Sequence, residues 1–93
     1  MFDRVLRRMQ AKIRSRQYVV TVHAEEEMDS DGLTIFDVER AILTGEIVER
    51  QKDRDTGEWK YLIKGQDIGG QDVIVVAKLS VTGKLAIITV YLL

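Results

Sequence analysis

The chain contains no cysteine and no proline. Without cysteine it can form no disulfide, and it offers no thiolate for a zinc site or for nucleophilic catalysis. The absence of proline is compatible with uninterrupted β-ladders. Long apolar runs are also missing, and no apolar segment with a small-residue cleavage site follows the N-terminus. We therefore expect a cytoplasmic protein that neither spans nor binds a membrane.

Net charge is small, at −1 near pH 7, but the charges are segregated along the chain. Residues 1–16 carry six basic side chains and one acidic one, a net charge of +5, so the remaining residues carry −6. A basic arm of this kind suits nucleic acid, an anionic surface or an acidic partner protein. A solvated helix face that offsets the acidic surface of the same chain produces the same pattern, and both interpretations stay open.

Apolar spacing predicts three helices and an early strand. The first helix covers roughly residues 3–16 and carries its basic side chains away from an apolar stripe. That stripe consists of Phe2, Val5, Leu6, Met9 and Ile13. A strand is predicted over 18–22, a short helix over 23–30 and another amphipathic helix over 34–44. Thr34 and Asp37 have the spacing of a capping box at the start of this last helix.

The second half of the chain predicts strands and turns. Residues 46–51 and 58–64 form a hairpin around a turn at 53–57. Residues 72–80 and 85–93 are apolar on both faces, so we expect these two strands to be central or covered by helices. Short glycine-containing turns favour an antiparallel meander over 46–92. The class is α+β, one domain over 1–93, with N-terminal helices packed on a mostly antiparallel twisted sheet.

The only histidine, His23, lies where the predicted strand gives way to an acidic helical stretch. Among unperturbed side chains only imidazole changes charge between about pH 5 and 8, which makes this residue the candidate acid–base group. A histidine that closes a strand, with its ring half packed and bonded to backbone, gives the same sequence pattern, so that structural alternative stays open. RNA cleavage by 2′-hydroxyl attack needs a base, an acid and cations over the phosphate, without a metal. The candidate partners of His23 are Arg50, Lys60, Lys64 and Tyr91, with Lys78 and Tyr61 as further candidates.

Two other kinds of site are poorly supported. The carboxylates that follow His23, and the acidic turn at 53–58, lack the ligand spacing of a calcium loop. The glycines at 65, 69 and 70 are not followed by a helix start, so they form no phosphate cradle. We therefore expect no metal and no cofactor.

Several short motifs occur in a characteristic order. They are Thr21-Val22-His23-Ala24 with Met28 five residues after the histidine, Gly32-Leu33-Thr34, Asp37-Val38, Ile42 to Ile47, Tyr61 to Gly65, and Ile88 to Tyr91. In these motifs the chain resembles, over roughly residues 18–92, the small prokaryotic family called domain of unknown function 4258. The resemblance implies a fold similar to the RelE/ParE toxin superfamily and the MqsR-like mRNA interferases. It also implies a toxin of a type II toxin–antitoxin pair, by analogy at the level of the fold.

The chain departs from this family pattern at two positions. Glu27 and Asp31 stand where the family usually carries arginine, so two cations become carboxylates. The exchange argues against efficient RNA cleavage beside His23, and an isoelectric point near 5.8 points the same way.

Two functions follow from the sequence. The first is a toxin-like, metal-independent mRNA endonuclease with His23 as general acid or base, whose partners would be RNA or the ribosome and an antitoxin-like protein. The second is a non-catalytic protein-interaction module that keeps the fold. A homodimer is compatible with either function.

Overall fold

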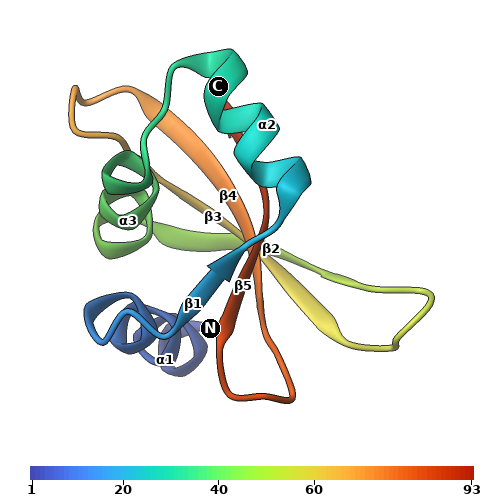
Figure 1. Cartoon of the computed structure of the whole chain (residues 1–93). Helices are drawn as coiled ribbons and strands as arrows, with labels where there is room; N and C mark the ends of the chain where they lie inside the picture. Colours follow the sequence, from blue (N-terminus) through green and yellow to red (C-terminus); the bar gives the residue numbers. More distant parts are fainter.

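The computed structural model describes all residues, 1–93. Three helices and five strands follow one another as α1 (Asp3–Arg14), β1 (Tyr18–Val20), α2 (Val22–Asp31), α3 (Ile35–Thr44), β2 (Glu46–Lys52), β3 (Trp59–Gln66), β4 (Asp72–Leu79) and β5 (Leu85–Leu92). The strands form one sheet in the order β1-β5-β4-β3-β2 (Figure 1). None of the helices has the length and apolar character needed to cross a membrane.

Most of the sheet is the predicted antiparallel meander. β2 pairs with β3, β3 with β4 and β4 with β5, all antiparallel. The short strand β1 pairs with β5 in parallel, so the complete sheet is mixed. β4 is the central strand and is buried from Val73 to Ala77, which confirms the expectation drawn from its two-sided apolar pattern.

α1 and α3 pack on one face of the sheet, and α2 lies along the edge of β5 with its buried side chains in the same core (Figure 1). On this face Ile63, Val75 and Ile87 are fully buried against the helices. The helices contribute Met9, Ile13, Ala24, Met28, Val38, Ala41 and Ile42 to the same core. No helix covers the second face, where Ile74 and Val76 are shielded by their neighbours within the sheet. We call this second face the uncovered face, because no helix packs on it.

The basic helix α1 is an integral part of the domain. Met9 is fully buried and Ile13 nearly so. Gln10 Nε2 donates to the backbone oxygens of Ile42 (3.2 Å) and Leu43 (3.4 Å), at the C-terminal end of α3, where a helix leaves carbonyls without partners. The predicted apolar stripe therefore docks α1 on the domain. α1 ends at Arg14, two residues earlier than predicted, shortly before Arg16 takes a left-handed φ of 57°.

Removing residues 1–16 is expected to lower the melting temperature by roughly 10 °C or more. The deletion exposes the core that Met9 and Ile13 cover. Truncating one such buried side chain alone costs about 2–5 kcal/mol of stability. In a domain of this size a loss of 1 kcal/mol lowers the melting temperature by about 4–8 °C. Thermal unfolding followed by circular dichroism measures the shift. The point variant Met9→Ala, compared with Arg7→Ala on the exposed face of α1, is the matched check. An unchanged melting temperature in the truncated chain would mean that α1 is a dispensable tail.

The second helix begins earlier than predicted. Thr21 Oγ1 accepts a hydrogen bond from Ala24 N at 3.1 Å, which caps the helix and ends the strand at Val20 rather than Val22. His23 therefore lies in the first turn of α2 and not at the end of a strand.

The predicted capping box of α3 is present. Thr34 Oγ1 accepts from Asp37 N, and Asp37 Oδ2 accepts from Thr34 N at 2.8 Å. The other carboxylate oxygen of Asp37 accepts from Ile68 N at 3.0 Å, which ties α3 to the loop between β3 and β4. The hydrogen bonds from the backbone N–H groups of Thr34 and Ile68 lower the pKa of Asp37 below its usual value.

Candidate functional site

The edge of β5 is covered first by β1 and then by α2. β1 pairs only with Leu85 to Ile87. At the end of β1 the backbone N–H of Thr21 donates to Ile87 O (3.0 Å), and the Thr21 hydroxyl donates to Ile88 O (3.1 Å). From there the chain turns into α2, which lies along the remaining part of β5 (Figure 1).

Two carboxylates of α2 take the place of a partner strand. Glu27 Oε1 accepts from Val90 N at 3.1 Å, and Asp31 Oδ2 accepts from Leu92 N at 3.3 Å. Residues four apart rise by about 6 Å along a helix, and residues two apart advance by about 6.7 Å along a strand. The two spacings match closely, so one face of α2 can satisfy alternate N–H groups of the β5 edge. α2 thereby closes an edge that would otherwise be free to pair with another chain.

This arrangement gives Glu27 and Asp31 a structural role in this chain. Each residue accepts a hydrogen bond from β5, a task that arginine cannot perform because its side chain only donates. Their presence in this chain therefore has a structural reason. The negative charge beside His23 remains, although backbone N–H groups partly compensate it.

His23 is held by one of these carboxylates. Its Nε2 lies 3.3 Å from Glu27 Oε1, the same oxygen that accepts from Val90 N. The His23 side chain is 67% exposed, and it makes no hydrogen bond to backbone. The structural alternative, a partly buried ring bonded to backbone, is therefore wrong. What the geometry provides is an accessible imidazole oriented by a carboxylate that the β5 backbone fixes, an arrangement suited to proton transfer.

Three of the other candidates lie on the uncovered face. Tyr91 pairs with Ile74, and Ile74 pairs with Lys64, which places these residues in one row across β5, β4 and β3. Lys60 follows on the same face of β3, four residues before Lys64 and about 13 Å away along the strand. His23 stands beside this row, since its carboxylate partner binds the residue before Tyr91.

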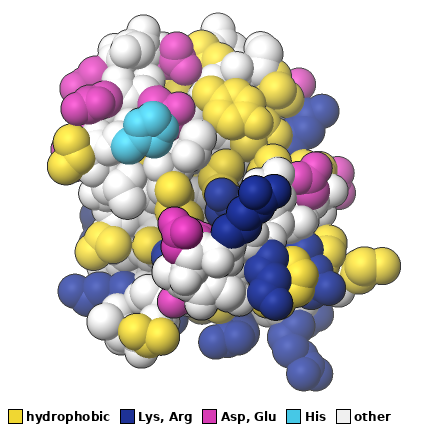
Figure 2. All heavy atoms as spheres, turned by 90° about the vertical axis from the view of Figure 1, so that its right-hand side faces the viewer, with side chains coloured by type: hydrophobic (Ala, Val, Ile, Leu, Met, Phe, Trp, Pro, Cys, Tyr) yellow, Lys and Arg dark blue, Asp and Glu magenta, His cyan; other side chains and the backbone are white.

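Figure 2 views the molecule from the side away from α1 and α3. The histidine, in cyan, lies among acidic side chains in the upper part of this view, while most lysine and arginine side chains gather lower down. The surroundings of His23 are thus acidic, and most cations on this side of the molecule lie away from it.

Arg50 does not join this group. It is paired with Tyr61, whose side chain packs against the core on the helix-covered face. Its guanidinium carbon lies 4.1 Å from the ring centroid of Trp59 and 5.8 Å from that of Phe2. The sheet register shifts between Ile47 and Glu49, and this irregularity turns Arg50 away from the face that simple alternation assigns to it.

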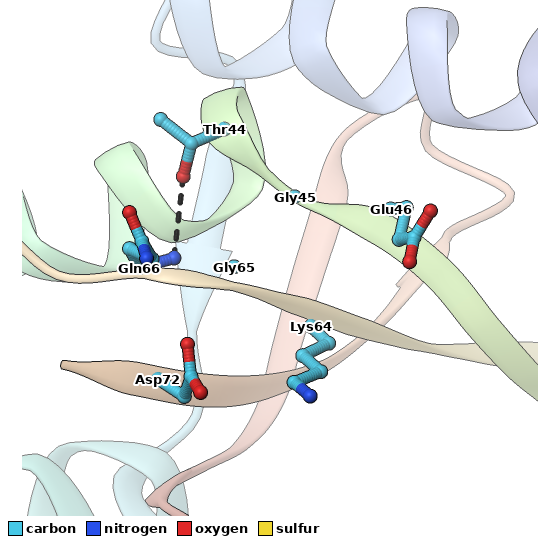
Figure 3. Close-up of a pocket in the computed structure, with 7 residues that line it drawn as sticks. All are labelled: Thr44, Gly45, Glu46, Lys64, Gly65, Gln66 and Asp72. Carbon is cyan, nitrogen blue, oxygen red and sulfur yellow. Dashed lines mark hydrogen bonds between the residues drawn. The ribbon is translucent and has the colours of Figure 1, made fainter. Parts of the chain in front are cut away.

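Lys64 also lines a polar hollow of about 340 Å³ beside the end of α3 (Figure 3). The hollow is lined by Thr44, Gly45, Glu46, Lys64, Gly65, Gln66 and Asp72. Thr44 Oγ1 accepts from Gln66 N at 3.2 Å, drawn as the dashed line. One cation here faces two carboxylates, so the hollow lacks the positive charge that a phosphate needs.

The chain belongs to the family described as domain of unknown function (DUF4258), whose model matches residues 20–92. The match begins at the end of β1 and reaches the end of β5, so it includes α2 with His23 and leaves α1 outside. No curated protein and no solved structure matches the chain. The description of this family names no activity.

Glu27→Ala is expected to lower the free energy of unfolding by about 1–3 kcal/mol, because it leaves the N–H of Val90 without its acceptor. Glu27→Gln keeps an oxygen at the same place and should cost clearly less. Glu26→Ala, exposed on the same helix and without a hydrogen bond, is the control and should stay within about 0.5 kcal/mol of wild type. Urea midpoints measure all three. Equal midpoints for Glu27→Ala and Glu26→Ala would show that the contact to β5 does not stabilise the fold.

Proposed function

We propose that the protein is a toxin-like ribonuclease of the type II toxin–antitoxin kind, with a RelE-like arrangement of helices packed on a sheet, and that it cleaves single-stranded RNA without a metal. One observation carries the proposal. The only histidine is exposed, is held by a carboxylate fixed on β5, and stands beside an uncovered sheet face with Tyr91, Lys60 and Lys64. The RelE-like placement is an analogy of architecture, supported by this free face.

The proposed reaction is attack of a ribose 2′-hydroxyl on the adjacent phosphorus. The 2′-oxygen forms a bond to phosphorus, the bond to the 5′-oxygen of the next nucleotide breaks, and a 2′,3′-cyclic phosphate remains. His23 accepts the proton of the 2′-hydroxyl, and Glu27 stabilises the imidazolium that forms. The phenol of Tyr91 donates a proton to the departing 5′-oxygen. Lys64 and Lys60, farther along the same face, attract the neighbouring phosphates of the strand and hold it across the sheet.

The test is cleavage of a labelled single-stranded RNA by the purified chain in the presence of a chelator. The expected products carry a 2′,3′-cyclic phosphate on one side and a free 5′-hydroxyl on the other, since the mechanism uses the neighbouring 2′-hydroxyl. An RNA whose 2′-hydroxyls are methylated should not be cut. Induced expression in a bacterial host should arrest growth. If the chain neither cuts RNA nor arrests growth, alone or with ribosomes present, the proposal fails.

A non-catalytic interaction module is the second candidate, and one observation favours it. The centre of the uncovered face is apolar, with Leu62, Ile74 and Val76 side by side, and its nearby cation Lys78 is neutralised by Glu58 at 3.1 Å. Such a face is closer to a protein-binding surface than to an RNA channel. Absence of both cleavage and growth arrest would favour this candidate.

A further inference from the structure

The basic side chains of the N-terminal segment have no acidic partners. The structure contains two ion pairs, His23 with Glu27 and Lys78 with Glu58, and neither involves residues 1–16. The basic segment therefore does not neutralise the acidic surface of the same chain through contacts. Its charge of +5 faces solvent and is available to an anionic ligand.

Three of these arginines surround a hollow on the surface of α1. Arg4, Arg7 and Arg8, with Ala11, line a space of about 420 Å³. Arg8 also lines a second hollow of about 330 Å³, which includes Trp59. Because the two hollows share Arg8, they form one continuous surface from α1 to the hairpin of β2 and β3.

The second hollow presents an aromatic platform. Trp59 is 41% exposed, and the guanidinium of Arg50 lies 4.1 Å from its ring centroid. Lys52 Nζ lies 5.8 Å from the same ring. These cations hold the indole in place and add positive charge around it. The one carboxylate in the lining, Glu58, is paired with Lys78 at 3.1 Å and so does not cancel that charge.

We propose that this basic–aromatic surface, made of Arg4, Arg7, Arg8, Arg50, Lys52 and Trp59, binds single-stranded RNA. The arginines bind backbone phosphates, and one base enters the second hollow against Trp59. An unpaired strand is required, because a base within a duplex is stacked on its neighbours and cannot reach the indole. The combination of unpaired arginines with an exposed indole favours nucleic acid over an acidic protein, which would use the charges alone.

This surface is separate from His23. α1 and the hairpin lie at the opposite end of the molecule from α2 (Figure 1), and Figure 2 shows the same separation of cations from the acidic surroundings of the histidine. RNA as the ligand class rests on the proposed ribonuclease function, but binding at this surface does not require catalysis. Binding at this surface would hold one part of the RNA strand, while the part that is cut extends over the rest of the protein.

The test measures binding of a fluorescent 2′-O-methyl RNA 12-mer to the full chain by anisotropy. This RNA cannot undergo 2′-hydroxyl attack, so binding is read independently of cleavage. The double variant Arg4→Gln with Arg8→Gln is expected to bind about tenfold more weakly or worse, and to reduce the slope of log affinity against log salt by about 1.4. Trp59→Leu is expected to weaken binding by about fivefold or more, through lost stacking.

A matched control distinguishes binding at this surface from attraction of RNA by positive charge in general. Arg14→Gln with Arg16→Gln removes two cations from the same segment but outside both hollows, and it should bind within about twofold of wild type. Equal losses in the two double variants would overturn the proposal, and so would binding of a glutamate 12-mer in place of RNA. Normal binding by a chain that cuts no RNA would support this surface and contradict the ribonuclease function. If the Arg4→Gln with Arg8→Gln variant keeps wild-type affinity and still cuts RNA normally, the ribonuclease function would be supported and this binding surface contradicted.

Discussion

His23→Ala is expected to lower RNA cleavage by about 10²–10⁴-fold, the usual contribution of a general acid or base. The same change should alter the free energy of unfolding by no more than about 0.5 kcal/mol. The ring is 67% exposed, and its only charged contact is with Glu27. Glu27 keeps its hydrogen bond from Val90 N when the ring is removed, so no buried group loses its partner. Cleavage rates and urea midpoints of the same preparation check both parts.

Glu27→Gln is the matched variant for this prediction. Glutamine retains an oxygen for Val90 N but removes the charge that stabilises the imidazolium, so cleavage should fall while the fold is kept. Lost cleavage together with a large loss of stability in His23→Ala would contradict the accessible ring seen here and return the residue to a structural role. Undiminished cleavage in His23→Ala would remove it from the mechanism.

The elements of the fold could be predicted because their signals are local. Period-3.6 spacing marked α1 and α3, and period-2 alternation marked the hairpin strands β2 and β3. The two-sided apolar pattern of β4 even predicted its central place in the sheet. The parallel pairing of β1 with β5 was not predicted, since only three residues of β1 take part and their partners lie 67 positions further along the chain.

The candidate site was harder to predict, because it depends on contacts between distant segments. Glu27 and Asp31 accept from β5 residues more than sixty positions away, so no local pattern distinguishes them from a solvated acidic face. Arg50 was a candidate as a cation of the sheet, but strict alternation along β2 cannot place it, because the irregularity between Ile47 and Glu49 reverses its face. Trp59 lies at the start of β3 and stays 41% exposed, which its apolar character alone does not indicate.

Gly65→Ala is expected to destabilise the fold by about 3 kcal/mol or more, at the upper end of the cost of overpacking. A Cβ atom at Gly65 would lie 1.8 Å from the backbone oxygen of Ala41 and 2.6 Å from its carbonyl carbon. These are backbone atoms of α3, so no side-chain rotation can relieve the contact and the whole helix has to move. α3 packs on β3 at this point, next to Lys64, and the displacement should therefore also disturb the uncovered face.

Gly69→Ala is the control for this prediction. Its Cβ would meet only Asp67 Oδ1 at 3.6 Å, an ordinary contact, and the residue does not require a positive φ. Alanine there also restricts the unfolded chain, which stabilises by about 0.4–1 kcal/mol when the native conformation is compatible. The urea midpoint of Gly65→Ala should thus fall, and that of Gly69→Ala should stay or rise. The free energies of unfolding derived from them should differ by at least about 3 kcal/mol. Similar midpoints would mean that α3 and β3 do not pack closely enough at Gly65 to exclude a methyl group.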